Sequence, residues 1–83
     1  MHAAMQDAAP SFLCPISYQV MEDPVVATDG HSYERAQIER WFKEHDRSPI
    51  TNQHMQSTTL IPNVSLRNAI SECYQPGSSP LII

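Results

Sequence analysis

Two cysteines, Cys14 and Cys73, constrain most strongly how this chain of 83 residues can be held together. Small secreted domains that cannot build a large core are usually held by several disulfides, and two cysteines allow one at most. The sequence therefore favours two reduced, structural thiols. A single disulfide between them is the alternative. A folded chain of this length buries roughly two-thirds of its unfolded surface, too little for a deep substrate cavity with a lid. We therefore expect one small recognition module rather than a self-contained metabolic enzyme.

The charge pattern excludes several partners and compartments. The net charge is −4, and no lysine or arginine precedes Arg35, so electrostatic binding of nucleic acid is not expected. The first residues lack the basic start and apolar run of a secretory signal, and no window reaches the roughly 20 apolar residues of a membrane span. We expect a soluble intracellular domain, cytoplasmic or nuclear, with no membrane partner.

Composition divides the chain into an organised centre and two tails. Residues 1–9 are mostly small or polar and read as a flexible tail. Residues 76–83, with the sequence PGSSPLII, open with turn-forming residues and read as a tail or linker. The organised domain is expected over 10–75, and no internal repeat is evident within it.

The first half of the domain predicts a β-hairpin followed by a helix. Val25–Ala27 is β-prone, Asp29–Gly30 is a strong two-residue turn signal, and Ser32–Tyr33 can return as the second strand. The spacing then becomes helical over Arg35–His45. The inward side of this helix is formed by Ile38, Trp41, Phe42 and His45.

The second half predicts a loop, a short strand and a second helix. Residues 46–55 read as a loop, and Ser57–Ile61 can form a strand. Asn63 can cap a helix that stops before Pro76–Gly77. The fold class is therefore α+β, with a hairpin, a central helix, two long loops and a C-terminal helix. The core is expected to contain Leu13, Val25, Tyr33, Ile38, Phe42, Leu60, Leu66, Ile70 and Cys73.

Polar residues occur in four pairs whose spacing is that of the cross-brace zinc domains called RING. The pairs are Cys14-x-x-Ser17, Asp29-x-His31, Glu34-x-x-Gln37 and Ser48-x-x-Thr51. Only Cys14 and His31 keep a cysteine or histidine, and they would belong to different metal sites, so zinc binding is not expected. The replacements can connect the same loops by hydrogen bonds, although ordinary loop residues are the alternative. The network is expected to contain Ser17, Asp29, His31, Glu34, Gln37, Ser48 and Thr51.

Five motifs follow one another along the same stretch: CPI, M-x-DPV, DGHSYER, SPIT and PN-x-x-L. With them the chain resembles the U-box family over Phe12–Tyr74. That family shares the RING fold without its zinc, so the resemblance implies no metal and no cofactor. It also implies the ubiquitin-ligase part of a larger protein. Such a domain binds a ubiquitin-conjugating enzyme that carries ubiquitin as a thioester, and promotes transfer to a lysine of a substrate bound elsewhere.

The resemblance implies a shallow apolar groove, formed by the two loops and the central helix, that receives the conjugating enzyme. Ile16 would be the main contact, with Tyr18 beside it. Trp41 would form the groove floor, and Pro49 would close the groove. Exposed apolar loop residues and tryptophan also suit protein interfaces on general grounds. The alternatives are a core-filling Ile16, a structural Trp41 and a Pro49 that only shapes its turn.

Arg47 has the position of the linchpin residue of active RING and U-box ligases. One guanidinium offers five N–H donors, so Arg47 could bond the conjugating enzyme and ubiquitin together. Catalysis would then come from positioning and a population shift, with no nucleophile on this domain. The alternative is a solvated arginine paired with Asp46 or Glu44, which contributes little.

Two further expectations concern partners. The acids Glu22, Asp23 and Asp29 could speed docking onto a basic helix of the conjugating enzyme. The rival to a ligase is a scaffold that keeps the fold without activating transfer, for example a homodimer built through Leu81–Ile83 or the second helix. The groove and linchpin residues argue against such an inactive copy.

Overall fold

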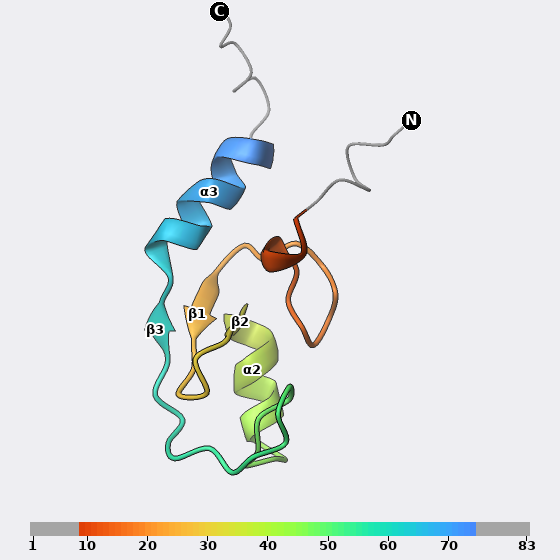
Figure 1. The fold of residues 1–83 in the computed structure, drawn as a ribbon, viewed down its shortest axis with the longest axis vertical. Coiled ribbons are helices and arrows are strands. Elements are labelled where there is room, and N and C mark those ends of the chain that lie inside the picture. The colour runs from red at the N-terminus through yellow and green to blue at the C-terminus, as the bar shows by residue number, and fades with distance from the viewer. Residues whose placement is uncertain (1–8, 75–83) are drawn as a thin grey trace, which may run out of the picture.

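The computed structural model describes residues 9–74, which form a three-stranded sheet, two α-helices and one short 3₁₀ helix. Figure 1 shows the sheet at the centre, α2 with a long loop at one end and α3 at the other. The α+β class expected from the sequence is confirmed. Within 9–74, no helix has the length and apolarity that crossing a bilayer requires. The elements are η1 (Pro10–Phe12), β1 (Pro24–Val26), β2 (Ser32–Glu34), α2 (Arg35–Phe42), β3 (Ile61–Pro62) and α3 (Val64–Tyr74).

The sheet has the order β2-β1-β3, and both neighbouring pairs are antiparallel. In the predicted hairpin, Val25 lies opposite Tyr33, and both residues are fully buried. Directly opposed residues project to the same face of an antiparallel pair, so these two side chains enter the core together. β3 returns after the second long loop and pairs Ile61 with Val26.

The strand expected over Ser57–Ile61 is mostly absent, because β3 contains only the last of these residues and Pro62. The hydroxyl of Ser57 accepts the N–H of Thr59 at 3.2 Å. Such a local side-chain bond competes with strand pairing. The polar start of the segment therefore stays irregular, and only its apolar end joins the sheet.

The hairpin turn differs by one residue from the sequence prediction. Asp29 and Gly30 are expected at the central positions, whereas the carbonyl of Ala27 accepts the N–H of Gly30 at 2.9 Å. This bond places Thr28 and Asp29 at the centre of the turn. Gly30 follows with φ of 85°, the arrangement of a three-residue hairpin loop in which glycine relieves the strain. The Asp29 carboxylate can then accept the N–H of His31 at 3.0 Å.

α2 is shorter than the predicted helix, Arg35–His45. The regular helix ends at Phe42, and the next two residues donate three positions back, which tightens the last turn. The N–H of His45 still donates to the carbonyl of Trp41 at 2.9 Å. The end of the helix therefore brings the ring of His45 onto that of Trp41, with centroids 3.8 Å apart.

α3 begins directly after Asn63, which caps it as predicted. The Oδ1 of Asn63 accepts the N–H of Leu66 at 3.1 Å, and its Nδ2 donates to the hydroxyl of Ser32 at 3.0 Å. One side chain thus starts the helix and fixes it to β2. The predicted stop before Pro76–Gly77 lies outside the described residues, as do nearly all of the two predicted tails.

The core lies between the sheet, the helices and the long loops. Its expected members that are buried are Val25, Tyr33, Ile38 and Ile70. Those that are half-buried and packed against the cluster are Phe42, Leu60 and Leu66. Buried residues that the sequence pattern does not predict are Cys14, Met21, Pro24, Ala27, Ser48 and Met55. Because several of these come from the loops, packing fixes the shape of the loops.

Two core predictions are wrong. Cys73 is exposed, because it lies about one turn beyond the buried Ile70, where α3 extends past the strands (Figure 1). Leu13 is half-buried outside the core cluster. It pairs with Val20 in an isolated bridge instead. Cys14 and Cys73 are both free thiols, the first buried in the core.

Candidate functional site

Loop 1 (Cys14–Gln19) is closed by backbone hydrogen bonds. The N–H of Cys14 donates to the carbonyl of Gln19 at 2.9 Å, and the N–H of Tyr18 donates to the carbonyl of Cys14 at 2.7 Å. The bridge between Leu13 and Val20 closes the loop at its base. Tyr18 has φ of 61°, a left-handed conformation that reverses the chain.

Loop 2 (Ser48–Gln53) has the same construction. The N–H of Ser48 donates to the carbonyl of Gln53 at 2.8 Å, and the N–H of Asn52 donates to the carbonyl of Ser48 at 2.9 Å. A bridge between Arg47 and His54 closes the base. Asn52 has φ of 64°, matching Tyr18 in loop 1.

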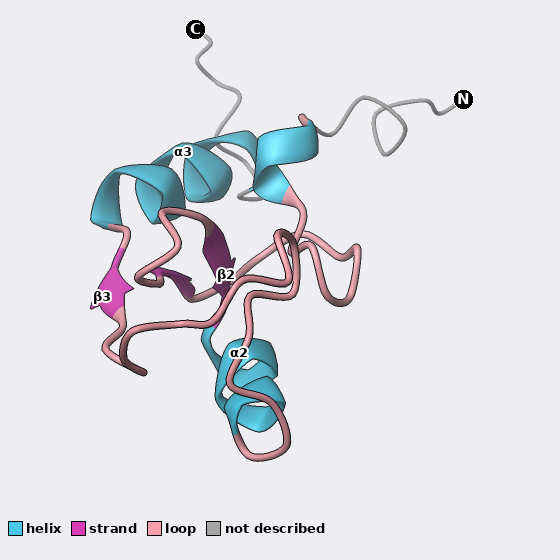
Figure 2. Cartoon of the chain, turned by 60° about the horizontal axis from the view of Figure 1, so that its bottom comes forward, coloured by secondary structure: helices cyan, strands magenta, loops and turns pink. Residues whose placement is uncertain are grey.

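The two loops form a short internal repeat, so the expectation of no repeat is wrong. Loop 1 reads CPISYQ and loop 2 reads SPITNQ. Both have proline second, isoleucine third, a hydroxyl residue fourth and a left-handed residue fifth. The repeat is difficult to see in the sequence because its first and fifth residues differ in chemistry. Long loops, pink in Figure 2, run beside α2 and form much of the molecule around it.

The carboxylate of Asp29 joins the hairpin to loop 2. Its Oδ2 accepts the hydroxyl protons of Tyr33 and Ser48, each at 2.6 Å, and its Oδ1 accepts the N–H of His31. The hydroxyl oxygen of Ser48 also accepts the N–H groups of the two residues after Pro49, at 3.1 and 3.0 Å. Charge-assisted bonds of this kind are the stronger class, so one buried serine fixes the loop to the hairpin.

Hydrogen bonding sets the protonation state of this network. Burial alone would raise the pKa of Asp29, but the bonds from Ser48, Tyr33 and the His31 N–H hold that pKa below its ordinary value of 3.8. Burial and the bond to Asp29 raise the pKa of the Tyr33 hydroxyl above its ordinary range. At neutral pH, Asp29 is therefore an ionised acceptor and Tyr33 a protonated donor.

A second group of bonds joins the end of β2 to loop 1 and to the segment before β1. The carboxylate of Glu34 accepts the N–H of Glu22 at 2.7 Å and that of Asp23 at 3.3 Å. The N–H of Glu34 donates to the Sγ of Cys14 at 3.3 Å. Arg35 adds an ion pair with Asp23, at 2.8 Å. The long segment before β1 is therefore held at several points.

The structure divides the predicted polar network into two kinds of member. Those whose side chains connect separate segments are Asp29, Glu34 and Ser48. The hydroxyls of Ser17 and Thr51 each accept the N–H two residues ahead, within their own loops. His31 contributes its backbone N–H, and Gln37 lies beside a surface hollow. Among residues 9–74, no three His, Cys, Asp or Glu side chains come together as a metal site would require.

A shallow hollow of about 160 Å³ lies between loop 1 and the C-terminal half of α2. Ile16 and Trp41 line it, and both are half-buried and packed against the core. Each side chain therefore exposes part of its apolar surface to the hollow, while the rest of the side chain packs on the core. The hollow is smaller than the several hundred Å³ usual for small-molecule sites, which suits contact with a protein. Its polar rim consists of Gln37, Arg40, Glu44 and His45.

Trp41 connects this hollow to loop 2. Its indole Nε1–H donates to the carbonyl of Arg47 at 2.7 Å. The ring stacks on His45 with an interplanar angle of 25°. Arg47, at the base of loop 2, is therefore hydrogen-bonded to Trp41, which lines the hollow.

The side chain of Arg47 is exposed and bends over its own loop. Its Nη1 donates to the carbonyl of Asn52 at 3.1 Å. Within residues 9–74, it does not make the ion pair with Asp46 or Glu44 considered from the sequence. Asp46 pairs instead with His54, at 3.4 Å. The guanidinium is therefore tied to the loop by a carbonyl and not neutralised by a carboxylate.

The other two predicted contact residues lie on the loops and not in the hollow. Tyr18 is 76% exposed on loop 1, and Pro49 is half-buried on loop 2. Next to Pro49, Ile50 is 45% exposed and has the position in loop 2 that Ile16 has in loop 1. Apolar surface is therefore present on both loops.

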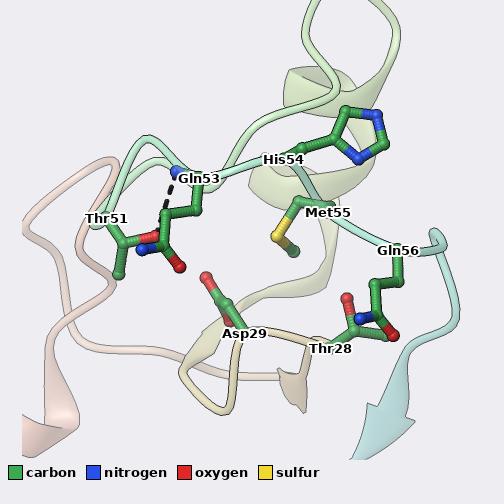
Figure 3. Close-up of a pocket in the computed structure, with 7 residues that line it drawn as sticks. All are labelled: Thr28, Asp29, Thr51, Gln53, His54, Met55 and Gln56. Atoms are coloured by element: carbon green, nitrogen blue, oxygen red, sulfur yellow. Dashed lines mark hydrogen bonds between the residues drawn. The ribbon is translucent and has the colours of Figure 1, made fainter.

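A second hollow, of about 300 Å³, lies between the hairpin turn and the chain that follows loop 2 (Figure 3). Thr28 and Asp29 line one side, and Met55 is the apolar residue of the other, mostly polar, side. Because Asp29 already accepts bonds from Tyr33 and Ser48, its charge is used within the fold. We assign this hollow no function.

Sequence reasoning missed three residues of the site. Asn52 and Ile50 could have been found by aligning the two loops, because they match Tyr18 and Ile16. The contact of His45 with the tryptophan has no such signal, since it depends on where α2 ends.

Comparison with known proteins gives the same family over most of the chain. The family model for the U-box domain matches residues 8–76. U-box domain-containing protein 36 of Arabidopsis thaliana is 49% identical over 65 residues, which cover 77% of this chain and 15% of the relative. WD repeat, SAM and U-box domain-containing protein 1 of Danio rerio is 53% identical over 60 residues, which cover 71% and 12%. The chain thus spans less than a fifth of the length of these relatives, and its organised region belongs to the U-box family.

Proposed function

We propose that this domain binds a ubiquitin-conjugating enzyme charged with ubiquitin and promotes transfer of the ubiquitin to a lysine. U-box domains are generally ubiquitin-ligase modules, so family membership supports this class of activity. The observation that carries the finer proposal is the 2.7 Å hydrogen bond from the Trp41 indole to the Arg47 carbonyl. This bond joins an apolar docking hollow to a basic residue that could reach the bound enzyme.

In this proposal, the conjugating enzyme docks on the apolar surface around the hollow. Ile16 and Trp41 receive an apolar part of the enzyme, and Tyr18 and Pro49 extend the contact on the two loops. A few well-anchored apolar side chains with a polar rim suit a small, transient protein contact. The substrate would be bound by other parts of a larger protein, inside the cell in the cytoplasm or nucleus.

Arg47 would act by positioning. One N–H group of its guanidinium donates to the Asn52 carbonyl, and among residues 9–74 the other side-chain N–H groups make no hydrogen bond. Bonds to both the conjugating enzyme and ubiquitin would hold the thioester in one pose and raise the fraction of molecules ready for attack by a lysine. No thiol of this domain is required, because Cys14 is buried and Cys73 lies on α3, which does not line the hollow.

A scaffold or dimerisation role is the second candidate, because an apolar patch lies away from the hollow. Ile61 in β3 and Val64 in α3 are 61% and 50% exposed. A homodimer built on this patch would leave Ile16 and Trp41 free. The two roles are therefore separable by experiment.

The test is discharge of ubiquitin from a charged conjugating enzyme onto free lysine, followed as loss of the thioester in the presence of EDTA. We expect the wild-type domain to accelerate discharge, Ile16→Ala to abolish the acceleration, and Arg47→Ala to reduce it about tenfold, the effect of losing one charge-assisted bond. Cys73→Ser is the control and should match the wild type. No acceleration across a panel of conjugating enzymes would reject the ligase proposal in favour of the scaffold.

A further inference from the structure

A long exposed arginine is a poor linchpin unless something restricts it. Arginine has many rotamers, and fixing them only when the partner binds would oppose the positioning effect. Besides the bridge to His54, two hydrogen bonds within residues 9–74 restrict Arg47 in the free domain, one on its backbone and one on its side chain. They come from separate elements, α2 and loop 2.

The backbone contact comes from Trp41. Its indole N–H donates to the Arg47 carbonyl at 2.7 Å, and the indole is itself held by packing on the core and by stacking on His45. Because Trp41 belongs to α2, the position of the Arg47 backbone is set by a helix rather than by the loop alone.

The side-chain contact comes from Asn52. Its carbonyl accepts from Nη1 of Arg47 at 3.1 Å, and the direction of that carbonyl depends on the left-handed backbone, with φ of 64°. Asparagine and glycine tolerate this conformation, whereas a β-branched residue does not. The N–H of Asn52 is bonded to Ser48, which is bonded to Asp29, so the contact is connected to the hairpin.

Comparison of the two similar loops shows which feature occurs only in loop 2. Tyr18 has the same left-handed backbone in loop 1, but the residue at the base of that loop is Leu13, which has no side-chain donor. The loop geometry alone therefore does not require an arginine contact. Loop 2 combines the same geometry with Arg47 and with the indole of Trp41.

We infer that Trp41 and Asn52 are positioning residues for Arg47, Trp41 through its indole N–H on the Arg47 carbonyl and Asn52 through its carbonyl on the guanidinium. The inference rests on the proposed function, because it matters only if Arg47 directs transfer. It predicts that both residues affect the maximal rate of discharge more than the affinity for the conjugating enzyme.

The experiment is single-turnover discharge of the charged conjugating enzyme at increasing concentrations of the domain. Trp41→Phe keeps an apolar floor and removes the N–H. We expect its maximal rate to fall about three- to tenfold, the effect of one hydrogen bond, and its half-saturating concentration, which also reports the apolar contact of residue 41, to change by a smaller factor. Asn52→Val should cause a similar loss of maximal rate, and Asn52→Gly, which keeps the left-handed backbone, should retain most of that rate.

Combination with Arg47→Ala separates positioning from a general structural role. If Trp41 acts through Arg47, adding Trp41→Phe to Arg47→Ala causes no further loss of maximal rate, whereas an independent role lowers both backgrounds equally. Thermal unfolding of each variant identifies loss of the fold. Asn68→Val, at an exposed position of α3, is the control for replacing an asparagine by valine. If Asn52→Val unfolds, the comparison of Trp41→Phe in the wild-type and Arg47→Ala backgrounds tests the inference alone.

The outcomes distinguish this inference from the proposed function. A wild-type maximal rate for Arg47→Ala would overturn the function assigned to Arg47. A reduced rate for Arg47→Ala, with wild-type maximal rates for Trp41→Phe and a folded Asn52→Val, would overturn only the positioning inference.

Discussion

Asp29 is the residue at which the hairpin, the buried Tyr33 and loop 2 meet. Its carboxylate accepts two hydroxyl protons at 2.6 Å and one backbone N–H. An amide at the same place offers one accepting oxygen and turns a donor toward other donors. Loss of the carboxylate would therefore leave either the two hydroxyls of Tyr33 and Ser48 or the N–H of His31 facing an amide donor, and the bonds that remain would no longer be charge-assisted.

Asp29→Asn is expected to lower the free energy of unfolding by about 1.5–3 kcal/mol, the range for hydrogen bonds to a charged group. Urea unfolding followed by circular dichroism measures the change. Asp46→Asn is the matched control, because within residues 9–74 the side chain of Asp46 makes only an exposed pair with His54, and its substitution should cost less than about 1 kcal/mol. Equal effects of the two substitutions would show that the Asp29 network does not stabilise the fold.

The same residue predicts the acid dependence of stability. The folded-state pKa of Asp29 lies below its ordinary value of 3.8. A group with a depressed folded-state pKa stabilises the fold above its unfolded pKa, and this contribution is lost as pH falls through the folded value. The stability difference between wild type and Asp29→Asn should therefore shrink as the pH is lowered from about 5 through 3.8 and below. Urea midpoints across this range test the sign, and a constant difference would contradict it.

At the scale of elements, patterns of apolar spacing predicted which helices and strands exist, and side-chain hydrogen bonds accompany three of their boundaries: the hairpin turn, the start of β3 and the start of α3. The hairpin and α2 follow from β-prone and helical spacing. The hairpin turn is shifted by one residue, and the Asp29 carboxylate within it accepts the N–H of His31. The strand predicted over Ser57–Ile61 forms only at its last residue, and Ser57 bonds Thr59 in the irregular part. Such boundaries depend on individual polar atoms, which periodicity does not describe.

The two loops offer a comparison of two serines, one on each loop. Ser48 is buried, donates to Asp29 and accepts two backbone N–H groups, whereas Ser17 accepts one N–H at 3.3 Å within loop 1. We expect Ser48→Ala to lower the free energy of unfolding by about 1–3 kcal/mol and Ser17→Ala by less than about 0.5 kcal/mol. Chemical denaturation checks both values, and a larger loss for Ser17→Ala would contradict this description of the loops.

At the scale of the whole molecule, the motifs predicted a set of site residues, but not the contacts that hold these residues in place. They indicated Ile16, Trp41 and Arg47 from their places in the sequence. The indole bond to the Arg47 carbonyl and the stacking of His45 depend on where α2 ends, so they could not be predicted from motif positions. The core prediction failed at Cys73 for a similar reason, because helical spacing does not show where a helix extends past its sheet.

The molecule places its two apolar surfaces on different elements. The hollow lies between loop 1 and α2. The exposed Ile61 and Val64 lie on β3 and at the start of α3, two elements that do not line the hollow (Figure 1). A partner that uses the hollow should therefore leave β3 and α3 undisturbed. This separation allows one binding experiment to decide between the proposed ligase surface and the alternative scaffold surface.

The most direct measurement is a titration of the isotope-labelled domain with a conjugating enzyme that carries no ubiquitin. The backbone amide and tryptophan indole signals of the domain are monitored by nuclear magnetic resonance. The proposed docking surface predicts the largest changes in loop 1, loop 2 and the C-terminal half of α2, including the indole signal of Trp41, and predicts that Ile16→Ala suppresses them. Signals of Ile61 and Val64 should stay in place. Changes centred on Ile61 and Val64, with none around Ile16 and Trp41, would contradict the proposed docking surface.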